Sequence, residues 1–226
     1  MKISTKDKWI VVGILGAVTL TISWIYRKQI KSGAQSLSDF VSKLKNVAVN
    51  EWNYWKGGKT KEGNPETMDR LKTYWIEGAG IKNWTDKKMT DEAWSAAFIS
   101  YVMKKSGAGK DWKYSPSHST YIVDSIKNRK TNNANPFKGY KPQEVKLEIG
   151  DLVGKGRQGS VGYDTTGSYL SHTDIVIGFK DGYAETIGGN IGNSVSMTKV
   201  PITPDRKIDN SKVRGEKYFV VIKNKK

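Results

Sequence analysis

The order of the hydrophobic patterns along the chain most constrains its fold, because helical periodicity comes first and strand alternation follows it. Apolar residues recur at helical spacing in four early segments: 34–55, 66–80, 93–106 and 115–128. Alternating segments follow the polar stretch 129–144, which is predicted to be a loop: 145–154, 169–180, 183–200 and 217–224. Helices that precede an antiparallel sheet predict an α+β domain.

A separate apolar run lies near the N-terminus, where residues 9–26 contain no charged residue. A helix of that length spans about 27 Å, which is just enough to cross the hydrocarbon of a membrane. Aromatic residues at both ends and flanking basic residues favour a transmembrane or signal-anchor helix over a cleaved signal peptide or a buried helix. The predicted organisation is a basic N-terminus (1–8), this helix, a basic linker (27–34) and one domain (35–226).

The composition narrows the partners and the chemistry. The formal net charge is +16, which attracts anionic surfaces such as bacterial wall polymers or anionic lipid. The basic residues are spread along the chain and form no nucleic-acid motif, so no specific nucleic-acid recognition is expected. The absence of cysteine excludes disulfides, thiolate metal sites and a thiol nucleophile.

The candidate chemistry lies at a helix start and at two histidines. Ser95 is a small polar residue at the start of the predicted helix 93–106, where a serine is most often a cap or a packed residue. The chain has only two histidines, His118 and His172, and His172 lies on a strand of the later hairpin. A polar residue at an early helix start with a later strand histidine is the layout of papain-like cell-wall peptidases and amidases.

Five ordered motifs make a more specific resemblance: AWSAAFISYVMKKSGAG, YSPSHSTYI, IGDLVGKGR, SHTDIVIGF and ETIGGNIGNSV. Together they resemble a domain of unknown function, family 2272 (DUF2272), which is similar to the NlpC-type and CHAP-type peptidoglycan hydrolases. The resemblance implies a papain-like fold of helices and an antiparallel sheet, with no cofactor.

The resemblance also implies roles for particular residues. Ser95 stands where those hydrolases carry their cysteine nucleophile, and His172 matches their catalytic histidine. Ser95 would attack, His172 would carry the proton, and Asn190 or Asp174 would orient His172. A serine hydroxyl is much less acidic than a thiol, so it needs a base within about 3 Å.

The geometry of the hairpin bears on the third group. If Asp181 and Gly182 form a two-residue turn, His172 faces Ile191 and Glu185 lies about 20 Å along the strand, which is too far. Asp174 shares a strand face with His172. Asn190 reaches the same place only if a bulge forms at the glycine pair just before it. Both Asn190 and Asp174 therefore stay candidates.

The second histidine leaves a further alternative open. His118 opens a predicted helix beside the Ser95 helix, with Tyr121 one turn on. We predict that Trp94, His118 and Tyr121 contact the substrate. If both histidines meet at Ser95, two imidazoles act there, or the histidines and Asp174 hold a metal; the wide spacing of these residues is a weak metal signal.

The predicted function is hydrolysis of an amide bond in peptidoglycan, by a protein of the cell envelope whose domain faces the periplasm or cell wall. Phage lysis, an injection device and bacterial wall remodelling all suit this function. Two other functions stay open: a catalytically inactive wall-binding or structural component that uses the same pocket, and a membrane-active toxin that acts through residues 9–26. No pattern in the sequence specifies an oligomer.

Overall fold

The computed structural model describes residues 39–226 except residue 158. The predicted segments 1–8, 9–26 and 27–34 lie outside the described residues. Within residues 39–226, no helix is long and apolar enough to cross a membrane. The description that follows concerns the compact unit Phe40–Lys226.

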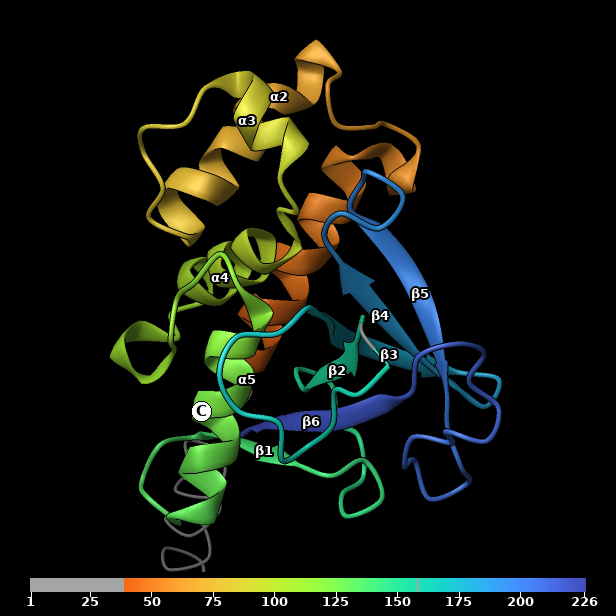
Figure 1. Cartoon of the computed structure of the whole chain (residues 1–226). Helices are drawn as coiled ribbons and strands as arrows, with labels where there is room; N and C mark the ends of the chain where they lie inside the picture. The colour runs from red at the N-terminus through yellow and green to blue at the C-terminus, as the bar shows by residue number, and fades with distance from the viewer. Residues whose placement is uncertain (1–38, 158) are drawn as a thin grey trace, which may run out of the picture. The chain divides into compact units, whose positions relative to one another are not determined.

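The helical part of this unit precedes the strands, as the sequence predicts (Figure 1). A helix covers residues 39–54, and the next elements are η1 (Lys56–Gly58), α2 (Pro65–Thr73), η2 (Tyr74–Gly78), α3 (Asp86–Asp91), α4 (Ser95–Lys105), η3 (Gly109–Asp111) and α5 (His118–Lys130). Helix α4 is buried along nearly its whole length, and Gly107 follows it with φ of 91°. Glycine adopts this left-handed conformation readily, so the chain turns away from the helix there.

The strands form one antiparallel sheet in the order β1-β6-β2-β3-β4-β5. Their bounds are β1 (Phe137–Tyr140), β2 (Leu152–Gly156), β3 (Ser171–Lys180), β4 (Tyr183–Gly188), β5 (Ser196–Pro201) and β6 (Tyr218–Asn224). The α+β class is therefore confirmed. Two details differ from the sequence prediction: β1 lies in the stretch predicted to be a loop, and the segment 183–200 contains two strands.

The sequence pattern does not predict β1, because the strand has four residues and lies within a polar stretch of the sequence. Its four residues pair with β6 at the edge of the sheet, and Gly139 lies against Ile126 and Ser125 of α5. A Cβ atom at Gly139 would lie 2.8 Å from the Ile126 side chain, so the glycine permits the helix to approach. The pairing comes from a partner more than eighty residues away, which no local pattern encodes.

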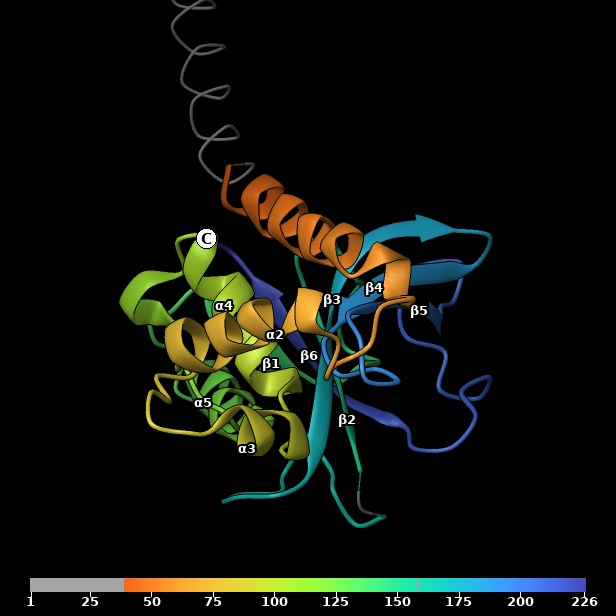
Figure 2. The ribbon, with the colours of Figure 1, turned by 90° about the horizontal axis from the view of Figure 1, so that it is seen from above.

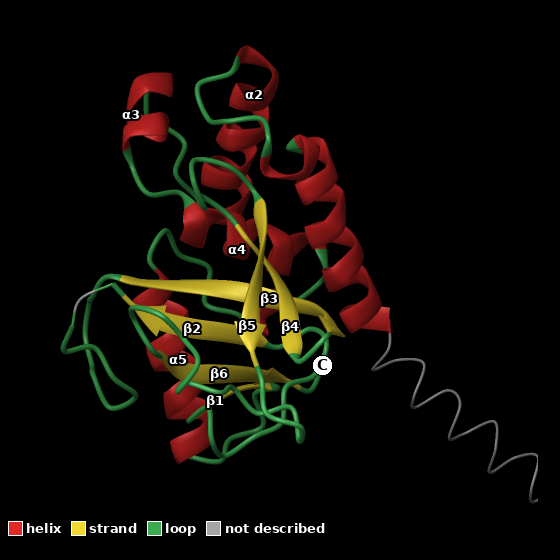
Figure 3. Ribbon diagram, turned by 90° about the vertical axis from the view of Figure 1, so that its right-hand side faces the viewer, coloured by secondary structure: helices red, strands yellow, loops and turns green. Residues whose placement is uncertain are grey.

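The β3–β4 hairpin confirms the predicted two-residue turn, and its bulge lies in β3 rather than at the glycine pair considered in the sequence analysis. Asp181 and Gly182 have φ of 50° and 79°, and Lys180 pairs with Tyr183. The register shifts by one residue between Val176 and Gly178, in β3 itself. A bulge increases the local twist, and in Figure 3 β4 and β5 are turned strongly relative to β2 and β6.

Both faces of the sheet are covered, and the two faces receive different side chains of β3. Helices α4 and α5 pack on one face, as Figures 2 and 3 show, where Ile175 joins the main core. Val176 joins a smaller apolar cluster on the other face. Because side chains alternate along a strand, Thr173 points with Ile175 toward the helices, whereas His172 and Asp174 point with Val176. Strand β3 therefore presents polar groups on both faces.

Candidate functional site

Ser95 is the first residue of α4, and the residue in the cap position is Trp94. The Ser95 Oγ atom lies 2.6 Å from Nε2 of His118, the first residue of α5. The Ser95 hydroxyl is therefore directed at an imidazole. This contact removes the interpretation of Ser95 as a helix cap and gives it the geometry of a serine–base pair.

The other ring nitrogen of His118 contacts two hydroxyl groups. Its Nδ1 atom lies 2.9 Å from Oγ1 of Thr173 and also contacts the Tyr121 hydroxyl. Both hydroxyls are able to accept a hydrogen bond, so a proton on Nδ1 leaves the Nε2 lone pair for the Ser95 hydroxyl. Burial, with nearby His172 and Arg157 adding to it, holds the pKa of His118 well below its ordinary 6.5. His118 is therefore neutral at pH 7 and able to accept a proton.

His172 belongs to a second, adjacent group. Its Nε2 atom lies 2.7 Å from Oδ1 of Asp174, and its Nδ1 atom lies 3.1 Å from Nη2 of Arg157. A guanidinium only donates hydrogen bonds, so Nδ1 accepts from Arg157 while Nε2–H donates to Asp174. Both nitrogens of His172 are occupied. The two imidazole rings, of His118 and His172, lie with centroids 5.3 Å apart.

The structure thus pairs Ser95 with His118, whereas the resemblance assigned the base to His172. The reason is positional: Thr173 points from β3 toward the helices and anchors His118 beside Ser95, while His172 points with Asp174 to the other face. Of the two candidates for orienting His172, Asp174 makes the contact. Among the described residues, the Asn190 side chain makes no hydrogen bond, although Asn190 lines the same pocket as His172.

The predicted substrate contacts fall mostly in the interior. Trp94 is fully buried, and its ring stacks on Trp55 and Tyr74 at centroid distances of 5.1 and 5.7 Å. Trp94 therefore packs beneath the start of α4, and its predicted contact with substrate stays a prediction. His118 and Tyr121 are also buried, and within the described part of the chain neither lines the pocket beside His172.

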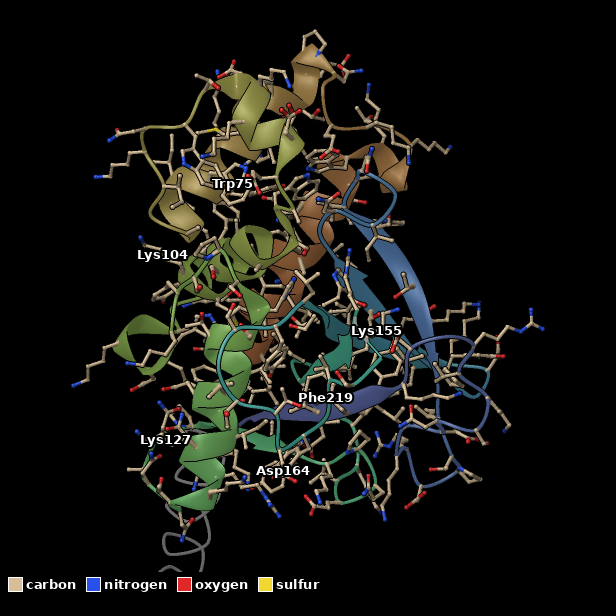
Figure 4. All side chains as sticks on the ribbon, viewed as in Figure 1. Trp75, Lys104, Lys127, Lys155, Asp164 and Phe219 are labelled. Atoms are coloured by element: carbon tan, nitrogen blue, oxygen red, sulfur yellow. The ribbon has the colours of Figure 1, made fainter. Side chains whose placement is uncertain are left out.

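A pocket of about 730 Å³ opens beside His172 and Asp174. Its lining is rich in cationic side chains: Lys155, Arg157, Lys199, Lys212 and Arg214. The carboxylates in the lining are those of Asp174 and Glu216. Figure 4 labels Lys155 among the strands, whereas Lys104 and Lys127 lie on the outer side of the helices. Within residues 39–226, no group of three or more histidine and acidic side chains is placed to hold a metal ion.

Sequence reasoning missed two residues that contact the histidines of the candidate site, Thr173 and Arg157. The motif SHTDIVIGF contained a signal for Thr173, since strand alternation places it on the face opposite His172 and Asp174. Arg157 follows directly after β2, and Lys155 pairs with His172 across the two strands. That register brings Arg157 to the start of β3, but it depends on pairing that the sequence alone does not specify.

Gly188 is needed for the position of Asp174. A Cβ atom at Gly188 would lie only 1.8 Å from Oδ1 of Asp174, the atom that contacts His172. We therefore expect Gly188→Ala to displace the Asp174 carboxylate, to break its contact with His172 and to destabilise the fold by about 1–3 kcal/mol. Urea unfolding and the imidazole NMR signals of His172 measure the two effects.

The matched control is Gly178→Ala in the same hairpin. A Cβ atom at Gly178 meets only the end of the Glu185 side chain, at 3.3 Å, and that carboxylate is free to turn aside. Its expected effect on unfolding is within about 0.5 kcal/mol. Equal effects of the two substitutions, or an unchanged His172 signal in Gly188→Ala, would contradict the assigned role of Gly188.

Comparison with known proteins identifies the family. Residues 49–222 match the sequence model of the family described as "Uncharacterized protein conserved in bacteria (DUF2272)". No curated protein and no solved structure matches the chain. The matched segment contains Ser95, His118, His172 and Asp174, and it lies within the predicted domain 35–226. Because it takes up well over half of the chain, the protein belongs to the bacterial family DUF2272.

Proposed function

We propose that the protein hydrolyses an amide bond in the stem peptides of bacterial peptidoglycan, with a papain-like arrangement in which serine replaces cysteine. The observation that carries the proposal is the 2.6 Å contact between Ser95 Oγ and His118 Nε2 at the start of α4. A neutral imidazole this close to a hydroxyl supplies the base that a serine nucleophile requires.

In the proposed mechanism, Ser95 Oγ attacks the amide carbonyl and its proton passes to Nε2 of His118. The N–H groups in the first turn of α4 have no acceptor within the helix, so they stabilise the oxyanion. His118 then gives the proton to the leaving amine as the carbon–nitrogen bond breaks. Water then gives a proton to Nε2 of His118 and attacks the ester carbonyl; as the bond from that carbon to Ser95 Oγ breaks, His118 returns the proton to Oγ and the acid is released. Thr173 and Tyr121 keep the ring in place throughout.

Charge supports an anionic substrate and a location in the cell envelope. The chain carries a formal net charge of +16, and cationic side chains surround the pocket beside His172. Such a field concentrates anionic wall polymers near the protein. Residues 9–26 have the length and flanks of a membrane anchor, so we propose a tethered protein whose domain faces the wall.

The test is digestion of purified peptidoglycan by the full-length chain, with the released fragments identified by mass spectrometry. We expect fragments with new amine and carboxyl ends, and we expect Ser95→Ala to abolish them. Ser106→Ala is the matched control, because Ser106 is a buried serine just after the same helix whose hydroxyl donates to the Val102 carbonyl. Fragments that persist in Ser95→Ala would refute the proposed nucleophile.

A second function, wall binding without cleavage, is favoured by one observation. Ser95 is only 3% exposed, and within the described residues the pocket is lined by His172 but not by Ser95. A binding protein would need the pocket and not the hydroxyl. In the same digestion it would release no fragments, yet it would sediment with insoluble peptidoglycan.

A further inference from the structure

The cationic side chains that line the pocket beside His172 outnumber the carboxylates there. Its lining contains five cationic side chains and two carboxylates, and one of those carboxylates, Asp174, is already bound to His172. Among the described residues, Lys212 is the one lining cation that forms an ion pair, with Asp209 at 3.1 Å. Like charges that converge on a concave site favour a bound anion.

Arg157 lies where that anion would meet the reactive groups. Its side chain is exposed, lines the pocket and donates from Nη2 to Nδ1 of His172 at 3.1 Å. The acceptor in this contact is a neutral lone pair. A guanidinium binds a carboxylate more strongly, because the pair is charged and two parallel hydrogen bonds form at once. A carboxylate that enters the pocket therefore competes with His172 for Arg157.

We propose that Arg157 binds a free carboxylate of the substrate peptide, and that this binding releases Nδ1 of His172 toward the pocket. The proposal rests on the proposed function for the class of peptide. Asp174 keeps its contact with Nε2, so the ring stays in place while Nδ1 becomes available to a polar group of the substrate. The carboxylate thus serves both to anchor the peptide and to free the second imidazole.

The exchange of Arg157 from His172 to the substrate would make selectivity depend on the charge of one substrate group. A peptide that carries a carboxamide at that position presents the same size and nearly the same shape, but it cannot pair with a guanidinium. It would leave Arg157 on His172. The carboxylate peptide should therefore bind more tightly and should alone change the hydrogen bonding of His172.

The experiment measures binding apart from cleavage, in the full-length chain carrying Ser95→Ala. Two synthetic stem peptides serve as probes: one carries a free carboxylate on its glutamyl residue, and the other carries a carboxamide at the same position. Each peptide is titrated into the protein by calorimetry. We expect about tenfold tighter binding of the carboxylate peptide. The nitrogen-15 signal of His172 Nδ1 should move with the carboxylate peptide and not with the carboxamide peptide.

Arg157→Gln should reduce the preference for the carboxylate peptide over the carboxamide peptide to less than twofold. Arg157→Lys should keep part of this preference, because lysine keeps the charge but lacks the two parallel N–H donors of the guanidinium. Arg206→Gln is the charge-matched control; Arg206 stacks over Phe179 and lies outside the pocket lining. Equal binding of the two peptides, a preference that survives Arg157→Gln, or equal competition by inorganic phosphate would overturn the proposal.

These results separate the two proposals. An Arg157-dependent preference in a protein that digests no wall would support the carboxylate site and refute the hydrolase. Wall digestion without any preference between the two peptides would do the opposite.

Discussion

Replacing His118 by glutamine is expected to slow the proposed amide hydrolysis by at least about 10³-fold, because His118 is the base that contacts Ser95 among the described residues. Ser95→Ala should have a loss of similar size, and the double variant should be no slower than either single one, since nucleophile and base act as a unit. Initial rates of peptide release, at equal concentrations of folded protein, measure these effects.

His172→Gln is the control that distinguishes the two histidines. Both ring nitrogens of His172 are occupied by Asp174 and Arg157. The rate loss in His172→Gln should therefore be at least tenfold smaller than the rate loss in His118→Gln. A larger loss in His172→Gln would return the role of base to His172, as the resemblance to cysteine hydrolases implies.

The same assignment predicts the pH dependence of the rate. A general base must be neutral, and burial, with nearby His172 and Arg157, keeps the pKa of His118 well below 6.5. The rate should therefore be nearly the same at pH 6 and pH 7.5, and it should fall only at lower pH as His118 takes up a proton. A rate that already falls near pH 6.5 would contradict the assignment.

Lys223→Met is expected to destabilise the fold by about 3–5 kcal/mol at pH 7.5, because it leaves a buried carboxylate without its partner. The Lys223 ammonium lies 2.7 Å from Asp151, which is 1% exposed, and it also contacts Glu148 at 2.5 Å. These contacts connect β6 to the segment before β2. Urea unfolding of the two proteins measures the difference.

The loss in Lys223→Met should be smaller at pH 5. Burial raises the pKa of Asp151 to about 6 even with Lys223 beside it. The contribution of Asp151 to stability is therefore present below its ordinary 3.8 and is lost as the pH rises through 6. Removing the ammonium makes ionisation of the carboxyl still less favourable, so the damage grows with pH.

Lys226→Met is the matched control for that prediction. Lys226 lies 2.9 Å from Asp111, but about a third of each side chain is exposed, so the pair contributes less than about 1 kcal/mol. If Lys223→Met costs no more than Lys226→Met, or if its cost is the same at both pH values, the buried pair does not have the assigned role.

Much of the fold could be predicted because its signals are local. The helical period predicts α4 and α5, and the Asp181–Gly182 pair predicts the tight turn of the β3–β4 hairpin. The glycine pair Gly188–Gly189 at the end of β4 is a place where a bulge would have brought Asn190 beside His172, but the register shift lies in β3, between Val176 and Gly178.

The partners within the candidate site could not be predicted, because they meet across long stretches of chain. Ser95 and His118 are 23 positions apart, and His118 and Thr173 are 55 positions apart. The resemblance supplied Ser95 and His172 as a pair, but the contact with Ser95 depends on where the start of α5 packs against β3. The pairing of β2 with β3, which is also long-range, brings Arg157 to His172.

The α+β class, the tight hairpin turn, the strong positive charge and the place of Ser95 at a helix start could all be read from spacing or composition along neighbouring residues. The contacts of His118 with Ser95 and of Asp174 with His172, and the position of Arg157 at the pocket, became apparent in the folded chain alone. Those contacts depend on which face of β3 the helices cover, and strand alternation then assigns Thr173 to one imidazole and Asp174 to the other.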